Sequence, residues 1–312
     1  MSKLFKVTSS PHIRHEDSTS GIMLDVIFAL CPAAIYGCIL FGWRAAIILA
    51  TTIIVAVASE AAWNFALKKP QTIRDLSAVL TGLLLGMNLS SQTPVWIAAI
   101  GSIVAIIVVK QMFGGLGFNF ANPAITARIV LLVSFAGQMS NYTAPIEWWS
   151  TNSVDAISAA TPLAGEQVFS LKELFLGMHP GTIGETSSFL LIIGGIYLML
   201  RRVIKPIIPV SFIGTMAIAS LIAGNNLGLS IFGGGLMLGA IFMATDYVTT
   251  PTTDLGKLIF GIGGGLITFV IRQFASLPEG ISYAILIMNI LTPHINRLTL
   301  SKPFGAKEVA NS

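Results

Sequence analysis

Charged side chains are scarce in this sequence. Asp, Glu, Lys and Arg make up 10% of its 312 residues, whereas 54% are hydrophobic and the mean hydropathy is +0.80. Soluble domains carry about 25% charged residues and have no interior that could hide so much apolar surface. Long apolar runs recur at about the 20 residues that cross ~30 Å of hydrocarbon. The sequence therefore predicts an integral membrane protein.

Cysteine is nearly absent too, which excludes one class of redox centre. Cys31 and Cys38 lie seven residues apart, so they share one face of a helix, where we interpret them as small packing residues. Without Cys-x-x-Cys spacing, this chain alone should not hold an iron–sulfur cluster. The scattered histidines predict no metal site. Phosphate-loop and Gly-x-Gly-x-x-Gly motifs are also missing, so nucleotide hydrolysis and classical NAD binding have no support.

The apolar runs predict an all-α integral membrane protein with about ten transmembrane helices. Their connections are short and rich in turn residues, except for one long connection at residues 140–185. Five spans on each side of it would give two inverted five-helix halves, as in many transporters. The expected spans are residues 22–41, 45–67, 76–91, 94–112, 123–139, 186–204, 206–223, 228–245, 256–275 and 279–296. The expected segments are an N-terminal segment (1–21), a first half (22–139), a loop (140–185), a second half (186–297) and a tail (298–312).

Lys and Arg are distributed unevenly between the two sides of this ten-span arrangement. Three of them, Arg44, Lys172 and Arg272, fall on the side of the long loop, and Arg128 falls within a span. Because cytoplasmic loops carry an excess of Lys and Arg, both termini should be cytoplasmic and residues 140–185 should lie outside. The net charge of +4 then reflects topology and gives no indication of nucleic-acid binding. The fourteen on the cytoplasmic side are Lys3, Lys6, Arg14, Lys68, Lys69, Arg74, Lys110, Arg201, Arg202, Lys205, Lys257, Arg297, Lys302 and Lys307.

Six motifs give the chain a resemblance to a known family. In order, they are "SSPH" (9–12), "GGLGFNFANPA" (114–124), "DAISAATPL" (155–163), "GTIGETS" (181–187), "FMATDYVTTPTT" (242–253) and "PEGISYAILIMN" (278–289). To about residue 297 the chain resembles the family that contains the D subunit of the Rnf electron-transport complex and the B subunit of the Na⁺-translocating NADH:quinone reductase. Its length, without a long N-terminal extension, favours the Rnf member.

The resemblance implies a function and a set of partners. The implied function is that of a flavoprotein subunit in a bacterial or archaeal cell membrane. It would relay electrons between ferredoxin and NAD⁺ within a translocase that moves Na⁺ or H⁺. Implied partners are the other Rnf subunits, above all the membrane subunits and the outer-face FMN subunit, and a flavin transferase that modifies this chain.

The "DAISAATPL" element is the most specific of these motifs. The resemblance implies that FMN is attached through a phosphoester to Thr161, with Asp155, Ser158, Ala159 and Ala160 completing the element. The residue types suit this chemistry, because small alanines leave the hydroxyl accessible and Pro162 holds the next backbone out of a helix. On spacing alone, Ser158 and Thr161 could instead cap a short helix.

Four more residues are candidates for a second flavin, expected to be riboflavin held without a covalent bond. Asn119 and Asn122 could present amides to a flavin ring edge, or belong to a glycine turn before a helix that begins near Pro123. Asp246 could line a cofactor or cation site where the backbone is irregular, or cap a helix. Arg128 could face a flavin or an acidic partner, or snorkel to the surface.

One further acid and two rival functions stay open at this point. Glu60 lies inside the second expected span, where an ionisable side chain is a functional candidate by default. A flavin-free secondary transporter would also fit the composition and the five-plus-five arrangement. The B subunit of a quinone reductase is the second rival, and co-purifying subunits would distinguish it.

Overall fold

The computed structural model describes residues 18–145, 158, 159, 163, 169–185, 187–275 and 280–300, with side chains at 158 and 159 left aside. Helices dominate this part of the chain. In the first half they are α1 (Thr19–Phe41), α2 (Trp43–Ala66), η1 (Ile73–Asp75), α3 (Ser77–Met87), α4 (Val95–Ile103), η2 (Val104–Gln111), α5 (Pro123–Ser134) and α6 (Ala136–Met139). They continue as α7 (Leu171–Leu176), α8 (Ser188–Leu200), α9 (Ile207–Ile222), α10 (Leu227–Phe232), α11 (Leu236–Leu238), η5 (Gly239–Met243), α12 (Asp254–Phe274) and α13 (Ile281–Thr299).

Each expected span contains at least one of these helices. Within the described residues, α1, α2 and α12 are long and apolar enough to cross a membrane unaided, and the other apolar helices are shorter. The helical, apolar character of the fold is therefore confirmed. The number of ten crossings and the inverted relation of the halves stay predictions.

Three of the expected spans depart from a regular α-helix, two of them with a break. Residues 94–112 form α4 and then the π-helix η2, while residues 123–139 break at Phe135 into α5 and α6. Residues 228–245 form α10, α11 and the π-helix η5, with Gly234 at the break in the left-handed region at φ +70°. A continuous helix could not contain this left-handed backbone conformation. Glycine adopts it without steric cost.

The long connection also contains regular structure. Strands β1 (Tyr142–Thr143) and β2 (Ser158–Ala159) pair antiparallel, with Thr143 opposite Ser158. The backbone of Ser158 thus lies in a strand. This two-stranded ribbon is a small departure from the all-α expectation, and it joins the start of the connection to the "DAISAATPL" motif.

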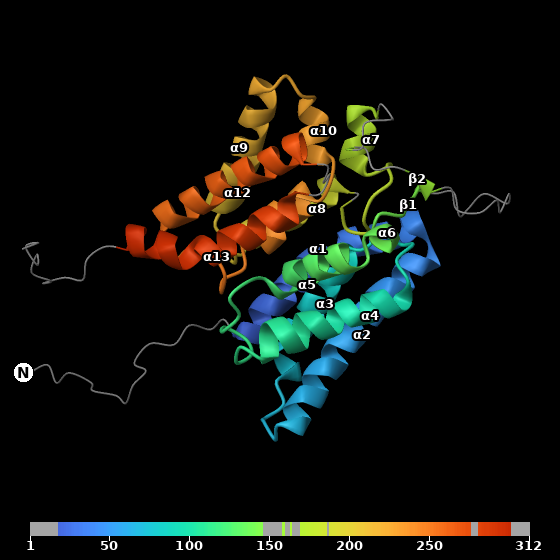
Figure 1. Cartoon of the computed structure of the whole chain (residues 1–312), viewed down its shortest axis with the longest axis vertical. Helices are drawn as coiled ribbons and strands as arrows, with labels where there is room; N and C mark the ends of the chain where they lie inside the picture. The colour runs from blue at the N-terminus through green and yellow to red at the C-terminus, as the bar shows by residue number, and fades with distance from the viewer. Residues whose placement is uncertain are drawn as a thin grey trace, which may run out of the picture.

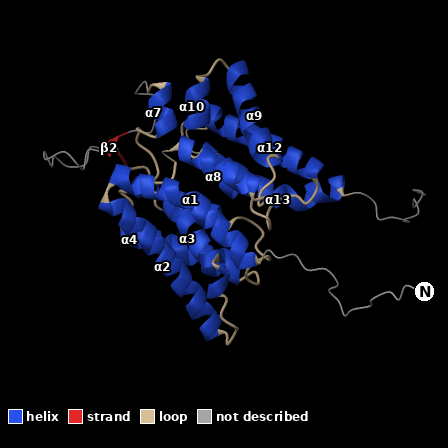
Figure 2. Ribbon diagram, turned by 180° about the vertical axis from the view of Figure 1, so that it is seen from behind, coloured by secondary structure: helices blue, strands red, loops and turns tan. Residues whose placement is uncertain are grey.

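The helices form two groups that meet along a shared interior. Helices α1 to α5, blue to green in Figure 1, lie together, and α8 to α13, yellow to red, form the second group. The groups meet where α1 packs on α8 and α5 packs on α13, and Figure 2 shows α1 beside α8 from behind. Large apolar side chains such as Phe65, Val133 and Ile222 remain exposed on the outer faces. Lipid tails would cover such surface.

Glycines allow α1 and α8 to approach closely. A Cβ atom added at Gly194 of α8 would clash with the backbone carbonyl oxygen of Ala29 in α1, and one at Gly37 of α1 would clash with that of Ile183. Backbone atoms cannot move aside as flexible side-chain ends do. Small residues at these positions therefore set the distance between the two helical groups.

We predict that Gly194→Ala destabilises the protein although alanine favours helix. Separating α1 from α8 should cost about 1–3 kcal/mol, as overpacking does elsewhere. Gly214→Ala in α9 is the matched control, because a Cβ there meets no atom within 4 Å. Thermal unfolding in detergent should show a lower midpoint for Gly194→Ala and an equal or higher one for Gly214→Ala. Equal midpoints for the two variants would contradict the close contact.

Candidate functional site: a pocket between the helical groups

A pocket opens between the two helical groups at the irregular backbone segments that follow the π-helices. Its empty space amounts to about 790 Å³, open space at its mouth included. Asn119, Asn122 and Asp246 all line it, although Asp246 is more than a hundred residues from the others in sequence. Ligand pockets typically combine apolar walls with a few polar groups. The apolar walls here include Val26, Leu80, Leu84 and Phe242.

Asn122 is fixed in place by its role at the start of α5. Its Oδ1 accepts hydrogen bonds from the backbone N–H groups of Ala124 and Ile125, and Pro123 occupies the first helical turn. Its Nδ2 donates to the carbonyl oxygen of Met243 at 3.3 Å, which joins α5 to the end of η5. Asn119 is also buried, and its Nδ2 donates to the carbonyl oxygen of Ala121 at 3.0 Å. Both amides thus hold the pocket wall in shape.

Asp246 begins the second irregular segment. Its carboxylate accepts hydrogen bonds from Thr249 Oγ1, at 3.1 Å, and from the backbone N–H of Val248. Its carbonyl oxygen accepts one from Thr250 Oγ1 at 2.8 Å. These bonds hold the backbone between η5 and α12 in a tight turn. The pocket therefore has a carboxyl group, fixed by its own turn, on one wall.

Arg128 lies deeper, outside the pocket lining. Its side chain is 1% exposed, so it does not snorkel to the surface. Nη1 donates to Asn88 Oδ1 at 2.7 Å and to Ser282 Oγ at 3.3 Å, which connects α3, α5 and α13. Glu185 and Tyr142 are close enough to act on it electrostatically. Burial raises the pKa of Tyr142 to about 12, against the opposing effect of the Arg128 charge, so its hydroxyl stays protonated at neutral pH.

The proposed attachment motif is described only in part. Thr161 and Asp155 lie outside the described residues, and Ser158 is described by its backbone in β2 alone. The structure thus brings Asn119, Asn122 and Asp246 together, and Arg128 lies elsewhere in the interior. It does not bear on the position of Thr161.

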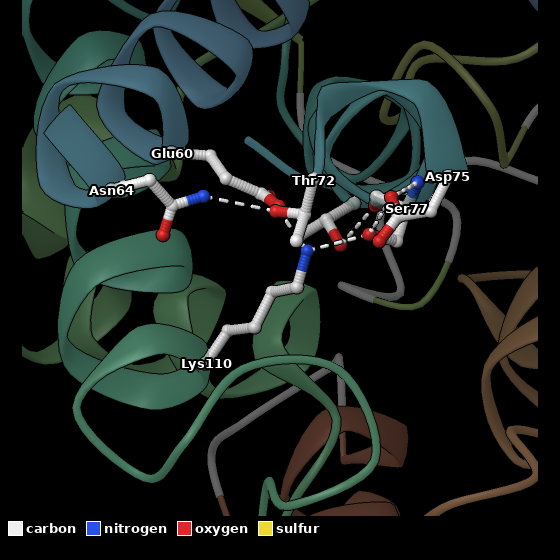
Figure 3. A network of polar contacts seen from close by, with 7 residues as sticks. Glu60, Asn64, Thr72, Asp75, Ser77 and Lys110 are labelled. Atoms are coloured by element: carbon white, nitrogen blue, oxygen red, sulfur yellow. Dashed lines mark hydrogen bonds and ion pairs between the residues drawn. The ribbon is translucent and has the colours of Figure 1, made fainter. Parts of the chain in front are cut away.

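Glu60 belongs to a buried polar network beside the pocket. Lys110 Nζ donates to Glu60 Oε2 at 2.7 Å and to Ser77 Oγ at 2.6 Å, and the side chains of Lys110 and Glu60 are 3% and 0% exposed. Thr72 Oγ1 donates to the other oxygen of Glu60 and accepts from Asn64 Nδ2 at 3.0 Å. Figure 3 shows these side chains pointing toward one another from α2, the start of α3 and η2.

Sequence reasoning misses this ion pair. Charge counting places Lys110 among the cytoplasmic charges that orient the chain, whereas the residue is 2% exposed and also lines the pocket. Fifty residues separate it from Glu60, so no local spacing indicates the contact. The usable signal is that one acid and one base both fall inside apolar spans, where each needs a partner.

Comparison with known proteins identifies the family. The profile of the NQR2, RnfD, RnfE family matches residues 6–305. The chain belongs to this family. With its apolar helices, this membership makes it a multi-pass membrane protein.

Several relatives of this family member align over nearly the whole chain. The D subunit of the Na(+)-translocating ferredoxin:NAD(+) oxidoreductase complex of Acetobacterium woodii is 45% identical over 97% of this chain and 96% of its own. The D subunit of the proton-translocating ferredoxin:NAD(+) oxidoreductase complex of Clostridium ljungdahlii is 41% identical over 97% of both. The D subunit of the ion-translocating oxidoreductase complex of Stutzerimonas stutzeri is 36% identical over 92% of both. The first two are named for different ions, so similarity alone does not identify the ion here.

The buried ion pair predicts a strong dependence of stability on both partners. Removing one partner leaves the other charge buried and unpaired, so Glu60→Gln or Lys110→Met should each cost about 3–5 kcal/mol. The double variant should cost much less than the sum, because it leaves no unpaired charge. Thermal unfolding in detergent measures the cycle, and additive losses would contradict the pairing.

An exposed ion pair in the same chain provides the control. Lys205 Nζ lies 2.6 Å from Asp254 Oδ1, and both side chains are 58% exposed. Exposed pairs contribute at most about 1 kcal/mol. Asp254→Asn should therefore change stability far less than Glu60→Gln, although the distances are similar.

Proposed function

We propose that this protein is the D subunit of an ion-translocating ferredoxin:NAD⁺ oxidoreductase complex. The observation that carries the proposal is the alignment with relatives of that name along 97% of this chain. Ferredoxin and NAD⁺ bind to other subunits, since this chain lacks nucleotide-binding motifs and cluster cysteines. Its own task is electron relay through flavin within the membrane, coupled to movement of Na⁺ or H⁺.

The pocket supports a non-covalent flavin at the cytoplasmic side. An isoalloxazine ring is flat and apolar on its faces and polar along its edge, and the pocket offers apolar walls with Asn119, Asn122, Lys110 and Asp246 as polar groups. The described lining residues include no cluster of phosphate-binding donors, which favours riboflavin over FMN. The flavin would supply one- and two-electron chemistry when bound. The residues of the chain hold its ring and exclude water from it.

Covalent FMN at Thr161, attached by a flavin transferase, is the second part of the proposal. Asp155 and Ser158 form the remainder of the motif that the transferase would recognise. We place this motif on the outer side and both termini in the cytoplasm. The arrangement in Figure 1 supports this, because α13 ends on the side away from β1, β2 and α7. The outer-face FMN subunit would then be its neighbour in the complex.

Thr161→Ala should abolish the covalent adduct without unfolding the chain, because a single loop hydroxyl contributes little to stability. Intact-mass measurement of the wild-type chain should show an excess of one FMN minus one water, and flavin fluorescence should survive denaturing electrophoresis. Ser140→Ala is the control and should keep the mass excess, because Ser140 lies outside the motif and its exposed hydroxyl donates to the carbonyl oxygen of Ala136. If Thr161→Ala retains the mass excess, FMN is attached to another residue. If the wild-type chain lacks the mass excess, a flavin-free transporter is favoured.

Filling the pocket should remove the second flavin alone. Thr81 lines the pocket, and among the described residues its hydroxyl bonds only to the carbonyl oxygen of Ser77 in its own helix, so Thr81→Phe adds a ring inside the pocket at little other cost. Acid extraction should release one flavin from the wild-type protein and none from the variant, while covalent FMN stays in both. Ile54→Phe places the same ring on an exposed face, 66% accessible, as control. Equal release from all three proteins would exclude this pocket as the site.

A further inference from the structure

The side chain of Lys110 contacts a buried carboxylate and also lines the pocket between the helical groups. It lies in the last turn of the π-helix η2. Glu60, its ion-pair partner on α2, is absent from the described pocket lining. The positive end of this ion pair therefore lies at the pocket, and the negative end lies behind it.

Two carboxylates hold the ammonium group of Lys110 in place. Glu60 accepts from Nζ directly, whereas Ser77 Oγ accepts from Nζ at 2.6 Å and donates to Asp75 Oδ1 at 2.5 Å (Figure 3). These contacts use two of the three N–H donors of the ammonium group. Ser77 lines the pocket as well. Lys110 is thus fixed at the pocket wall, with one N–H donor that neither contact uses.

The backbone beside this ammonium group has an unfavourable conformation. Leu76, between Asp75 and Ser77, has φ +62°, in the left-handed region that side chains other than glycine rarely adopt. Asp75 Oδ1 accepts from the backbone N–H of Ser77 at 2.8 Å across this residue. The position of Ser77 against Lys110 is therefore maintained together with backbone strain, which is common at functional sites.

Lys110 supplies the positive charge of the pocket. Among the described lining residues, the acidic and basic side chains are Asp246 and Lys110. The carboxylate of Asp246 is engaged by Thr249 Oγ1 and the backbone N–H of Val248, within its own turn. The side chain of Lys110 is 3% exposed, and a buried charge is screened much less than one in water. Its field therefore acts on the occupant of the pocket.

Reduction changes the charge of a flavin. An isoalloxazine ring that takes up two electrons and one proton carries one negative charge, whereas the oxidised ring is neutral. A positive group beside the ring stabilises the reduced form relative to the oxidised form, so the ring becomes easier to reduce. Glu60 opposes this effect, but it lies behind Lys110, and electrostatic energy falls with distance.

Resting on the proposed function, we propose that Lys110 sets the reduction potential of the pocket flavin by balancing the negative charge of its reduced form. The two electrons come from a reduced carrier in another subunit of the complex, and the proton comes from solvent. Lys110 forms and breaks no covalent bond in this step. Glu60 and Ser77 are positioning residues, which hold the ammonium group at the pocket wall.

The test uses the full chain, expressed without the flavin transferase so that the pocket flavin is its only flavin. Titration with dithionite against reference dyes, followed by flavin absorbance, measures the midpoint potential. Combining Glu60→Gln with Lys110→Met gives an uncharged pair, which should lower the equilibrium constant for reduction about tenfold, or about 30 mV for a two-electron couple. The nearer, positive charge dominates the loss. Lys110→Arg keeps the charge and should match wild type.

Lys205→Met with Asp254→Asn is the matched control. It neutralises an exposed ion pair, which solvent screens, and should leave the potential unchanged. If the uncharged buried pair does not accumulate, Lys110→Gln with Glu60→Gln carries the comparison, because the two amides can hydrogen-bond to each other. If a variant loses flavin on purification, the dissociation constants of added oxidised and dithionite-reduced riboflavin give the same shift as a ratio.

The outcomes distinguish this role of Lys110 from the flavin site itself. An unchanged potential in the uncharged pair overturns the role, as does an equal decrease in Lys110→Arg, which would show that packing and not charge sets the potential. Both of these outcomes leave a flavin in the pocket. A wild-type chain without releasable flavin, or release that persists in Thr81→Phe, instead contradicts the proposed flavin site and with it the role of Lys110.

Discussion

The hydrocarbon interior of a membrane provides no water to pair with polar groups, and the rest of this structure depends on that constraint. Irregular backbone is tolerated there only where protein buries it or a cavity lines it. Two irregular segments, 112–122 and 244–253, accordingly face one pocket, and Asn122 bonds the first to the end of η5. The same constraint pairs Lys110 with Glu60 and surrounds Arg128 with Asn88 and Ser282. These polar groups are thus gathered in the protein interior, while large apolar side chains face outward.

Most of the helical fold could be predicted from the sequence, because hydropathy over a window of about 20 residues reports transfer into lipid directly. The breaks at Phe135 and Gly234 could not be predicted, because an apolar run has the same hydropathy whether its helix is continuous or interrupted. Hydropathy does not distinguish π-helices from α-helices either. The two π-helical segments, η2 and η5, each end at the pocket, as such segments commonly do at functional sites.

Part of the candidate site could also be predicted, and the reason is chemical. Asn119, Asn122 and Asp246 are polar residues in otherwise apolar surroundings, so each needs a buried environment, and the structure places them on one pocket. The ion pair between Glu60 and Lys110 could not be predicted, since sequence periodicity carries no information about contacts between residues fifty positions apart. A count of charges therefore treats Lys110 as one of the cytoplasmic charges. It treats Arg272 in the same way, as an outer charge, although the guanidinium nitrogens of Arg272 are enclosed.

Two arginines, Arg128 and Arg272, have guanidinium nitrogens enclosed in the interior beyond the pocket. Asn122 lies at the pocket, and Arg128 follows six residues later on α5, about 9 Å along the helix axis. Arg128 Nη1 lies close to Gly235, and Gly234, the preceding residue in the chain, lies against Arg272. Glu185 acts electrostatically on both arginines, so two positive charges share one acid in a region of low dielectric. Such a region favours added negative charge. The electron relay proposed for this chain would need this property along its interior, whichever cation its complex moves.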